Sequence, residues 1–118
     1  MCLFFTNLND KNQMKSTREE LLRLIKKVFV SSVPNGKIIL FGSHARGDAS
    51  EYSDWDLLVL LDKPKIEDTD YDTISYPLSE LGWQEGEQFS PKLYTYNDWI
   101  KRSFTPFYKN IQKEGIEL

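Results

Sequence analysis

Two spacings of apolar side chains predict where helices and strands form along the chain. Between residues 17 and 31, apolar positions recur every three or four residues, as on one face of an amphipathic helix: Leu21, Leu22, Ile25, Val28 and Phe29. Ser16 and Glu19 have the spacing of a capping box with Ser16 as the N-cap. Helical spacing returns at Tyr71, Ile74, Leu78 and Leu81, where Pro77 is expected to kink or shorten the helix and Gly82 to end it.

Short uninterrupted apolar runs predict the strands, because a strand that is buried on both faces shows no alternation. The expected strands are Lys37–Phe41, about residues 54–61, Trp83–Phe89 and Lys92–Tyr96. The last two are expected to meet at Pro91 as a third strand and a bent fourth strand. This order of elements predicts an α+β fold, or a mixed α/β fold, built on one sheet.

The two ends of the chain differ in character. Residues 1–15 are polar after the first few, which predicts a flexible N-terminal arm before a single domain at residues 16–118. Near the C-terminus, Asn97 or Asp98 is expected to cap a short helical turn, and Thr105-Pro106 to begin a last helix that ends at Gly115. Trp83, Trp99, Phe104 and Phe107 are expected to be core residues.

Composition narrows the class of protein. The net charge of −3 makes nucleic acid an unlikely partner, since binders of a phosphate backbone usually carry a basic excess. The single cysteine, Cys2, excludes an internal disulfide framework, and the single histidine leaves no zinc cluster to build. No apolar window is long enough for a membrane span, and Cys2-Leu3-Phe4-Phe5 is too short for a signal-peptide core. We therefore expect a cytoplasmic protein.

The stretch between the first two predicted strands carries the candidate chemistry. Gly42-Ser43 ends one strand and opens a short helical turn at residues 43–46, where a hydroxyl and free backbone N–H groups can hold phosphate oxygens. Asp54 and Asp56 open the next strand, and its two-residue period places both carboxylates on one face, away from Trp55. Their mutual repulsion favours a hard divalent cation such as Mg²⁺.

Gly42-Ser43, ten further residues and then Asp54-x-Asp56, flanked by apolar runs, resemble the nucleotidyltransferase superfamily that includes DNA polymerase beta. The Gly-Ser-x-Ala-Arg-Gly form and the small size are similar to the minimal nucleotidyltransferases. The resemblance implies a mixed sheet with helices packed mainly on one face. It implies that Gly42 and Ser43 bind the triphosphate and that Asp54 and Asp56 are catalytic and hold one or two Mg²⁺ ions. Arg46 is a further candidate for binding the phosphates.

The resemblance also implies a third carboxylate on a neighbouring strand, and the sequence offers no clear equivalent. Glu85 and Glu87 are the candidates, and Glu87 is the choice. Phe89-Ser90-Pro91 occupies the expected place of the acid but supplies only a hydroxyl. Binding of nucleotide and catalysis are therefore separate questions for this chain.

The function implied by the resemblance is transfer of a nucleoside monophosphate from an NTP, preferably ATP, to a hydroxyl of a protein or small molecule, with release of pyrophosphate. A helical toxin-like protein is the implied partner, which would make the chain an antitoxin, and homo-oligomers stay open. The alternative is a catalytically degenerate binding module that sequesters a partner protein. A glycosyltransferase-like Asp-x-Asp site needs a much longer chain.

Simpler interpretations of the same residues also stay open. Gly42-Ser43 can be an ordinary strand-to-helix turn, and Asp54 and Asp56 can be solvated acids at a strand start. Arg46 can pair on the surface with Asp48 or Glu51. His44 is expected to face solvent rather than to act as a general base.

Overall fold

The computed structural model describes residues 16–33 and 35–118, so the predicted N-terminal arm lies outside the described residues. The elements are α2 (Arg18–Ser32), β1 (Lys37–Phe41), α3 (Ser43–Arg46), β2 (Trp55–Leu61), α4 (Asp68–Asp70), the π-helical segment η1 (Tyr71–Ser75), α5 (Tyr76–Gln84), β3 (Phe89–Thr95), α6 (Tyr96–Lys101), α7 (Pro106–Glu114) and β4 (Ile116–Glu117). In the described residues, no helix is long and apolar enough to cross a membrane.

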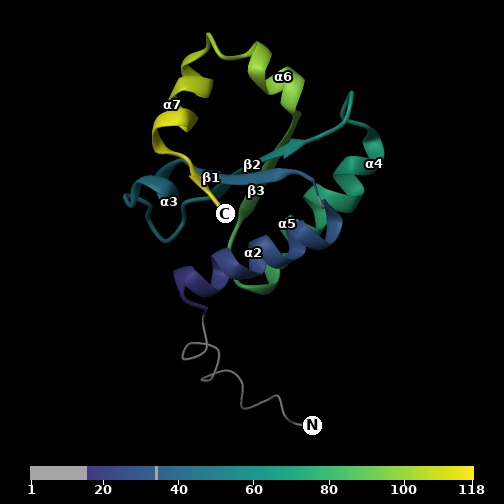
Figure 1. Cartoon of the computed structure of the whole chain (residues 1–118). Helices are drawn as coiled ribbons and strands as arrows, with labels where there is room; N and C mark the ends of the chain where they lie inside the picture. The colour runs from purple at the N-terminus through teal and green to yellow at the C-terminus, as the bar shows by residue number, and fades with distance from the viewer. Residues whose placement is uncertain (1–15, 34) are drawn as a thin grey trace, which may run out of the picture.

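The strands form a mixed sheet in the order β3-β2-β1-β4 (Figure 1). β1 runs antiparallel to both β2 and β4, while β2 and β3 are parallel. Parallel neighbours need a crossover connection, and the helical segment from α4 to α5 supplies it. The predicted α+β class with a mixed sheet is therefore confirmed.

The main core lies between one face of the sheet and helices α2 and α5. Leu21, Ile25 and Phe29 of α2 are buried there against side chains such as Leu57 and Val59 of β2. The helix begins one residue later than predicted, because Thr17 and Glu20, rather than Ser16 and Glu19, form the capping box. The spacing of apolar residues predicted the helix to within one residue, but Ser16 and Thr17 are both suitable N-caps, so the sequence left its first residue ambiguous.

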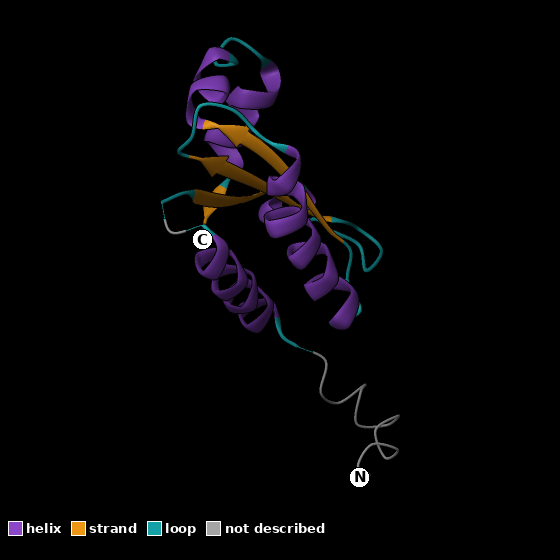
Figure 2. Cartoon of the chain, turned by 90° about the vertical axis from the view of Figure 1, so that its right-hand side faces the viewer, coloured by secondary structure: helices purple, strands orange, loops and turns teal. Residues whose placement is uncertain are grey.

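A second, smaller core covers the opposite face of the sheet. Trp99 of α6 and Ile111 of α7 are buried there with Phe41, Leu58 and Leu60. The side view in Figure 2 shows helices on both sides of the sheet. Trp99 is a buried core residue as predicted, and Phe107 packs half-buried against this core. Trp83 and Phe104 are 55% and 76% exposed, so the prediction is wrong for these two.

The crossover helix differs from the prediction at Gly82, while at Pro77 the structure shows a change of helix type. Pro77 lies in the first turn of α5, directly after the π-helical segment η1. Proline has no N–H to donate, and the change from π-helix to α-helix occurs just before it. Gly82 does not end the helix, which continues to Gln84. It is buried, and a Cβ there would lie 2.9 Å from the Phe89 ring, so this glycine lets β3 approach closely.

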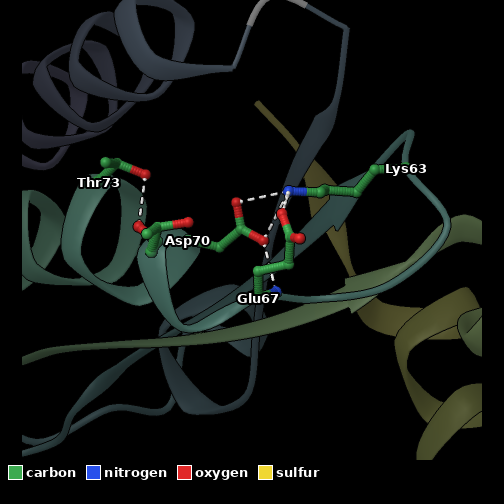
Figure 3. A network of polar contacts seen from close by, with 5 residues as sticks. Lys63, Glu67, Asp70 and Thr73 are labelled. Carbon is green, nitrogen blue, oxygen red and sulfur yellow. Dashed lines mark hydrogen bonds and ion pairs between the residues drawn. The ribbon is translucent and has the colours of Figure 1, made fainter.

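An ion cluster fixes the loop between β2 and the crossover helix (Figure 3). The Lys63 ammonium contacts both carboxylate oxygens of Asp70, at 3.0 and 2.9 Å, and Glu67 at 3.0 Å. Asp70 is buried and also accepts a hydrogen bond from the Glu67 backbone N–H, closing the cap of α4. These contacts anchor the start of the crossover, after the C-terminal end of β2. The connection from β1 to α3 lies at the other end of β2, because β1 and β2 are antiparallel.

β3 is one strand rather than the two predicted strands. It runs straight through Pro91, which pairs in register with Leu57. Proline is tolerated here because β3 lies at the edge of the sheet, where one side of the strand has no partner. Thr95, not Asn97 or Asp98, caps α6, while Thr105 caps α7 as predicted.

Candidate functional site

Gly42 makes a sharp corner between β1 and α3. Its backbone has φ 78° and ψ −158°, a conformation that is essentially restricted to glycine. The Gly42 carbonyl accepts hydrogen bonds from the N–H groups of Ala45 and Arg46, which closes the single turn of α3. Gly47 ends that turn with φ 88°, as predicted. The corner therefore presents Ser43 at the end of β1.

Asp56 packs directly against this corner. It pairs in register with Phe41 of β1 on one side and with Ser90 of β3 on the other. A Cβ built on Gly42 would overlap the Oδ2 atom of Asp56 and lie 3.3 Å from its Cγ. Only a residue without a side chain leaves room for the carboxylate here, so Gly42 and Asp56 occupy one compact site.

Asp54 completes the acid pair at the start of β2. Its carboxylate is exposed and accepts a hydrogen bond of 3.2 Å from the Ser90 hydroxyl. Trp55, between the two acids, is buried in the main core, so the strand alternates as the sequence predicted. Both acids therefore lie beside Ser90 of β3.

The electrostatics of the pair favour a cation. Burial and the neighbouring charge of Asp54 raise the pKa of Asp56 above its ordinary value. The positive charges of Lys92, His44 and Arg46 offset only part of this effect. A divalent cation would stabilise the ionised form of both carboxylates, and Mg²⁺ prefers oxygen ligands. Asp54 and Asp56 therefore fit Mg²⁺.

The corner and Asp56 line one cavity of about 370 Å³. Gly42, Ser43, Arg46 and Asp56 line one side of it. The lining contributed by α7 consists of Phe107, Asn110, Ile111 and Glu114. Arg46 is held at this cavity by Asp48 at 3.2 Å and by Glu114 at 3.4 Å. The surface pairing of Arg46 with Asp48 was foreseen, whereas the contact with Glu114 was not.

His44 and Glu87 both contact Trp55. The imidazole of His44 stacks on the indole with ring centroids 3.8 Å apart, and its Nε2 lies 3.1 Å from the Ser53 carbonyl. The expectation that His44 faces solvent is therefore wrong. The indole Nε1–H donates to Glu87 at 3.0 Å, which directs that carboxylate at Trp55. A role for Glu87 as third acid stays a prediction, and this contact counts against it.

The position opposite Asp56 on β3 belongs to Ser90 rather than to an acid. Among residues 16–33 and 35–118, no group of three or more His, Cys, Asp or Glu side chains could hold a metal. The other candidate, Glu85, accepts a hydrogen bond from the hydroxyl of Ser16, which lies two residues before α2. The described acid site therefore rests on Asp54 and Asp56.

Sequence reasoning missed three side chains near the site. Lys92 follows Ser90 by two residues and so shares its face of β3, a relation that becomes readable only when β3 is recognised as one strand. Asn110 and Glu114 come from α7, more than 50 residues beyond the acids, and no local pattern links them to the site.

Comparisons with known proteins identify the family. A model of the nucleotidyltransferase domain matches residues 22–116. Two proteins of Methanocaldococcus jannaschii, each named "putative protein adenylyltransferase", are similar in sequence. One is 34% identical over 82% of this chain, and the chain spans 65% of its length. The other is 33% identical over 70% of this chain and is matched over 76% of its own length.

The fold also has a solved counterpart. A crystal structure of a toxin–antitoxin with AMP-PNP superposes with a TM-score of 0.56 over 86% of this chain and 72% of its own, at 18% identity. This likeness supports the mixed-sheet fold, while the sequence matches carry the relationship. On these grounds, the chain belongs to the nucleotidyltransferase domain family.

Proposed function

We propose that this chain binds ATP with Mg²⁺ in the cavity and transfers AMP to a hydroxyl of a protein partner. The observation that carries the proposal is the shared cavity: Gly42, Ser43 and Asp56 line it together, and Asp54 directly precedes β2, two residues before Asp56. Mg²⁺ binds the phosphates of a nucleoside triphosphate, so the residues that bind phosphate and the residues that bind the metal must lie in the same cavity. The family of the chain supports the same chemistry.

Each residue has a separate task in this proposal. Gly42 lets phosphate oxygens approach the backbone, the Ser43 hydroxyl donates a hydrogen bond to them, and Arg46 offers a guanidinium at the cavity wall. Asp54 and Asp56 would hold Mg²⁺, which neutralises phosphate charge when bound. The acceptor oxygen forms a bond to the α-phosphorus, the bond from that phosphorus to the bridging oxygen breaks, pyrophosphate leaves and the hydroxyl proton is released.

A protein is the acceptor that we prefer. Both sequence relatives carry the name "putative protein adenylyltransferase", and the structural counterpart is a toxin–antitoxin. In this chain the acids are open to solvent at Asp54, so a second molecule can bring its hydroxyl to them. We extend the proposal to a helical toxin-like partner, which adenylylation by this chain would silence.

The test is transfer of label from ATP that carries the isotope in its α-phosphate, with Mg²⁺ and either purified candidate partners or cell extract. We expect a labelled protein band with the wild type and none with Asp56→Asn. ATP labelled in the γ-phosphate is the control, because AMP transfer moves no γ-phosphate. Equal labelling by wild type and Asp56→Asn would contradict the proposal.

A second candidate function is a binding module that holds a partner protein without chemistry. Ser90 favours it, because a hydroxyl stands opposite Asp56 where the family resemblance implies a third acid. This candidate predicts tight, Mg²⁺-dependent ATP binding or partner binding with no label transfer to any acceptor. Restored transfer in Ser90→Asp would show that the missing acid alone separates the two functions.

A further inference from the structure

The face of β3 beside the acid pair carries an exposed cation. Ser90, Lys92 and Tyr94 alternate onto one face of this strand, the face that Asp56 and Leu58 share on β2. Ser90 contacts Asp54, and the positive charge of Lys92 lies close enough to act on the Asp56 carboxylate. Lys92 is exposed. Next to the acids, β3 therefore offers a hydroxyl and an ammonium group.

The same surface continues into the turn after α6. The Arg102 guanidinium lies over the Tyr94 ring at 5.0 Å, and Tyr94 packs against Trp99 with centroids 5.4 Å apart. Phe104, in the same turn as Arg102, is 76% exposed. Figure 1 shows β3 leading directly into α6. We call Ser90, Lys92, Tyr94, Arg102 and Phe104 the β3 strip.

The charge of the β3 strip runs against that of the chain. The chain has a net charge of −3, yet both charged residues of the strip are cations. In the part of the chain that the structure describes, neither Lys92 nor Arg102 forms a salt bridge. Tyrosine, arginine and phenylalanine are enriched at protein interfaces, where they act as anchors. The chemistry of the strip therefore suits an acidic polypeptide with apolar side chains.

The position of the strip relative to the cavity suggests its role. The cavity lies on the β1 side of Asp56, where Gly42, Ser43 and Arg46 line it. The strip lies on the opposite, β3 side of the same residue, because β2 separates β1 from β3. A nucleotide in the cavity therefore leaves the β3 side open for the second substrate.

We infer that the β3 strip docks an acidic segment of the acceptor protein and delivers its hydroxyl to Asp54 and Asp56 past Ser90. This inference rests on the proposed function, since it names the class of acceptor for that reaction. Charge complementarity supplies the orientation of the segment, with its acids on Lys92 and Arg102 and an apolar side chain against Tyr94 and Phe104.

The experiment uses two fluorescent synthetic peptides, each with a central tyrosine, flanked by glutamates in one and by lysines in the other. Their binding to the full chain is measured by anisotropy without nucleotide at low ionic strength. We expect the wild type to prefer the acidic peptide despite its own net negative charge. In Lys92→Glu/Arg102→Glu, binding of the acidic peptide should fall about tenfold.

The matched control is Arg23→Glu/Lys27→Glu, which reverses one arginine and one lysine on the exposed face of α2. It changes the net charge equally but leaves the β3 strip intact, so it should keep most of the preference. Equal binding of both peptides by the wild type would overturn the inference. So would an unchanged preference in the strip variant, or tighter binding of a single-stranded oligonucleotide than of the acidic peptide.

Titration of ATP with Mg²⁺ separates this inference from the proposed function. Arg102→Glu alone should bind ATP as tightly as the wild type, because Arg102 does not line the cavity and, of the two cations, it is Lys92 whose charge acts on the Asp56 carboxylate. Loss of peptide preference with intact ATP binding supports a separate acceptor surface. Failure of the wild type to bind ATP would overturn the proposed function, whereas the peptide preference alone judges the docking surface.

Discussion

Gly42→Ala tests the link between the β1–α3 corner and the acid pair. The glycine has φ 78° and ψ −158°, and holding another residue there costs about 1–3 kcal/mol. In a domain of this size, 1 kcal/mol shifts the melting temperature by roughly 4–5 °C, so we expect a fall of roughly 4–15 °C. The new Cβ would also overlap Oδ2 of Asp56, which forces the carboxylate to swing out of the site.

Gly47→Ala is the matched control, because it strains the backbone of the same short helix without a collision. Gly47 has φ 88°, and a Cβ there would meet nothing within 4 Å. Left-handed backbone costs about 1–2 kcal/mol, so this variant should also melt earlier than the wild type. Its Mg²⁺-dependent ATP binding should nevertheless survive, since Asp56 keeps its place.

The assay combines thermal melts followed by circular dichroism with calorimetric titration of ATP and Mg²⁺, at a temperature where both variants are folded. We expect both glycine variants to lose stability and only Gly42→Ala to lose binding. ATP binding that is as tight in Gly42→Ala as in Gly47→Ala would refute the reasoning, because Asp56 would then not depend on the corner.

Three further substitutions test the charges of the structure. Because burial and Asp54 raise the pKa of Asp56, its ionised form costs stability at neutral pH. Asp56→Asn should therefore melt higher than the wild type at pH 7, with a gain that shrinks as the pH falls through the raised pKa; equal melting curves would contradict this. Ser90→Asp adds a carboxylate opposite Asp56, so it should tighten Mg²⁺ binding about tenfold in titrations and lower the melting temperature without metal. Burial acts to raise the pKa of Asp70, but hydrogen bonds from the Glu67 N–H and Lys63 outweigh it and hold the pKa below its ordinary value. Asp70→Asn should cost about 1 kcal/mol at pH 7, as for a lost helix cap, in denaturant unfolding. The difference from wild type should vanish as the pH falls through the lowered pKa, and a constant difference would argue against the assignment.

Most of the fold could be predicted because its helices and buried strands have clear periodicity. Apolar runs located β1 and β2 almost to the residue, and Thr105-Pro106 marked the start of α7. Errors arose where tertiary packing overrides local signals. Pro91 predicts the end of a strand, but the edge strand β3 continues through it. Gly82 predicts the end of a helix, but it lies within α5 and lets Phe89 pack closely.

The candidate site was predictable in its local part only. The sequence brought Gly42, Ser43, Asp54 and Asp56 together because strand alternation and one short connection determine where they lie. The far wall of the cavity, with Asn110 and Glu114, depends on how α7 folds back over β1, which no short-range pattern encodes. The exposed Trp83 and Phe104 were assigned to the core because residue type alone does not reveal a surface aromatic.

The most direct measurement for the central claim is calorimetric titration of ATP, with and without Mg²⁺, into the wild type, Ser43→Ala, Asp56→Asn and the double variant. If the hydroxyl and the carboxylate serve one triphosphate and its metal in one cavity, Mg²⁺ should tighten ATP binding in the wild type but not in Asp56→Asn. The two substitutions should also be non-additive. Mg²⁺-dependent ATP binding that is unchanged in both single variants would contradict the account.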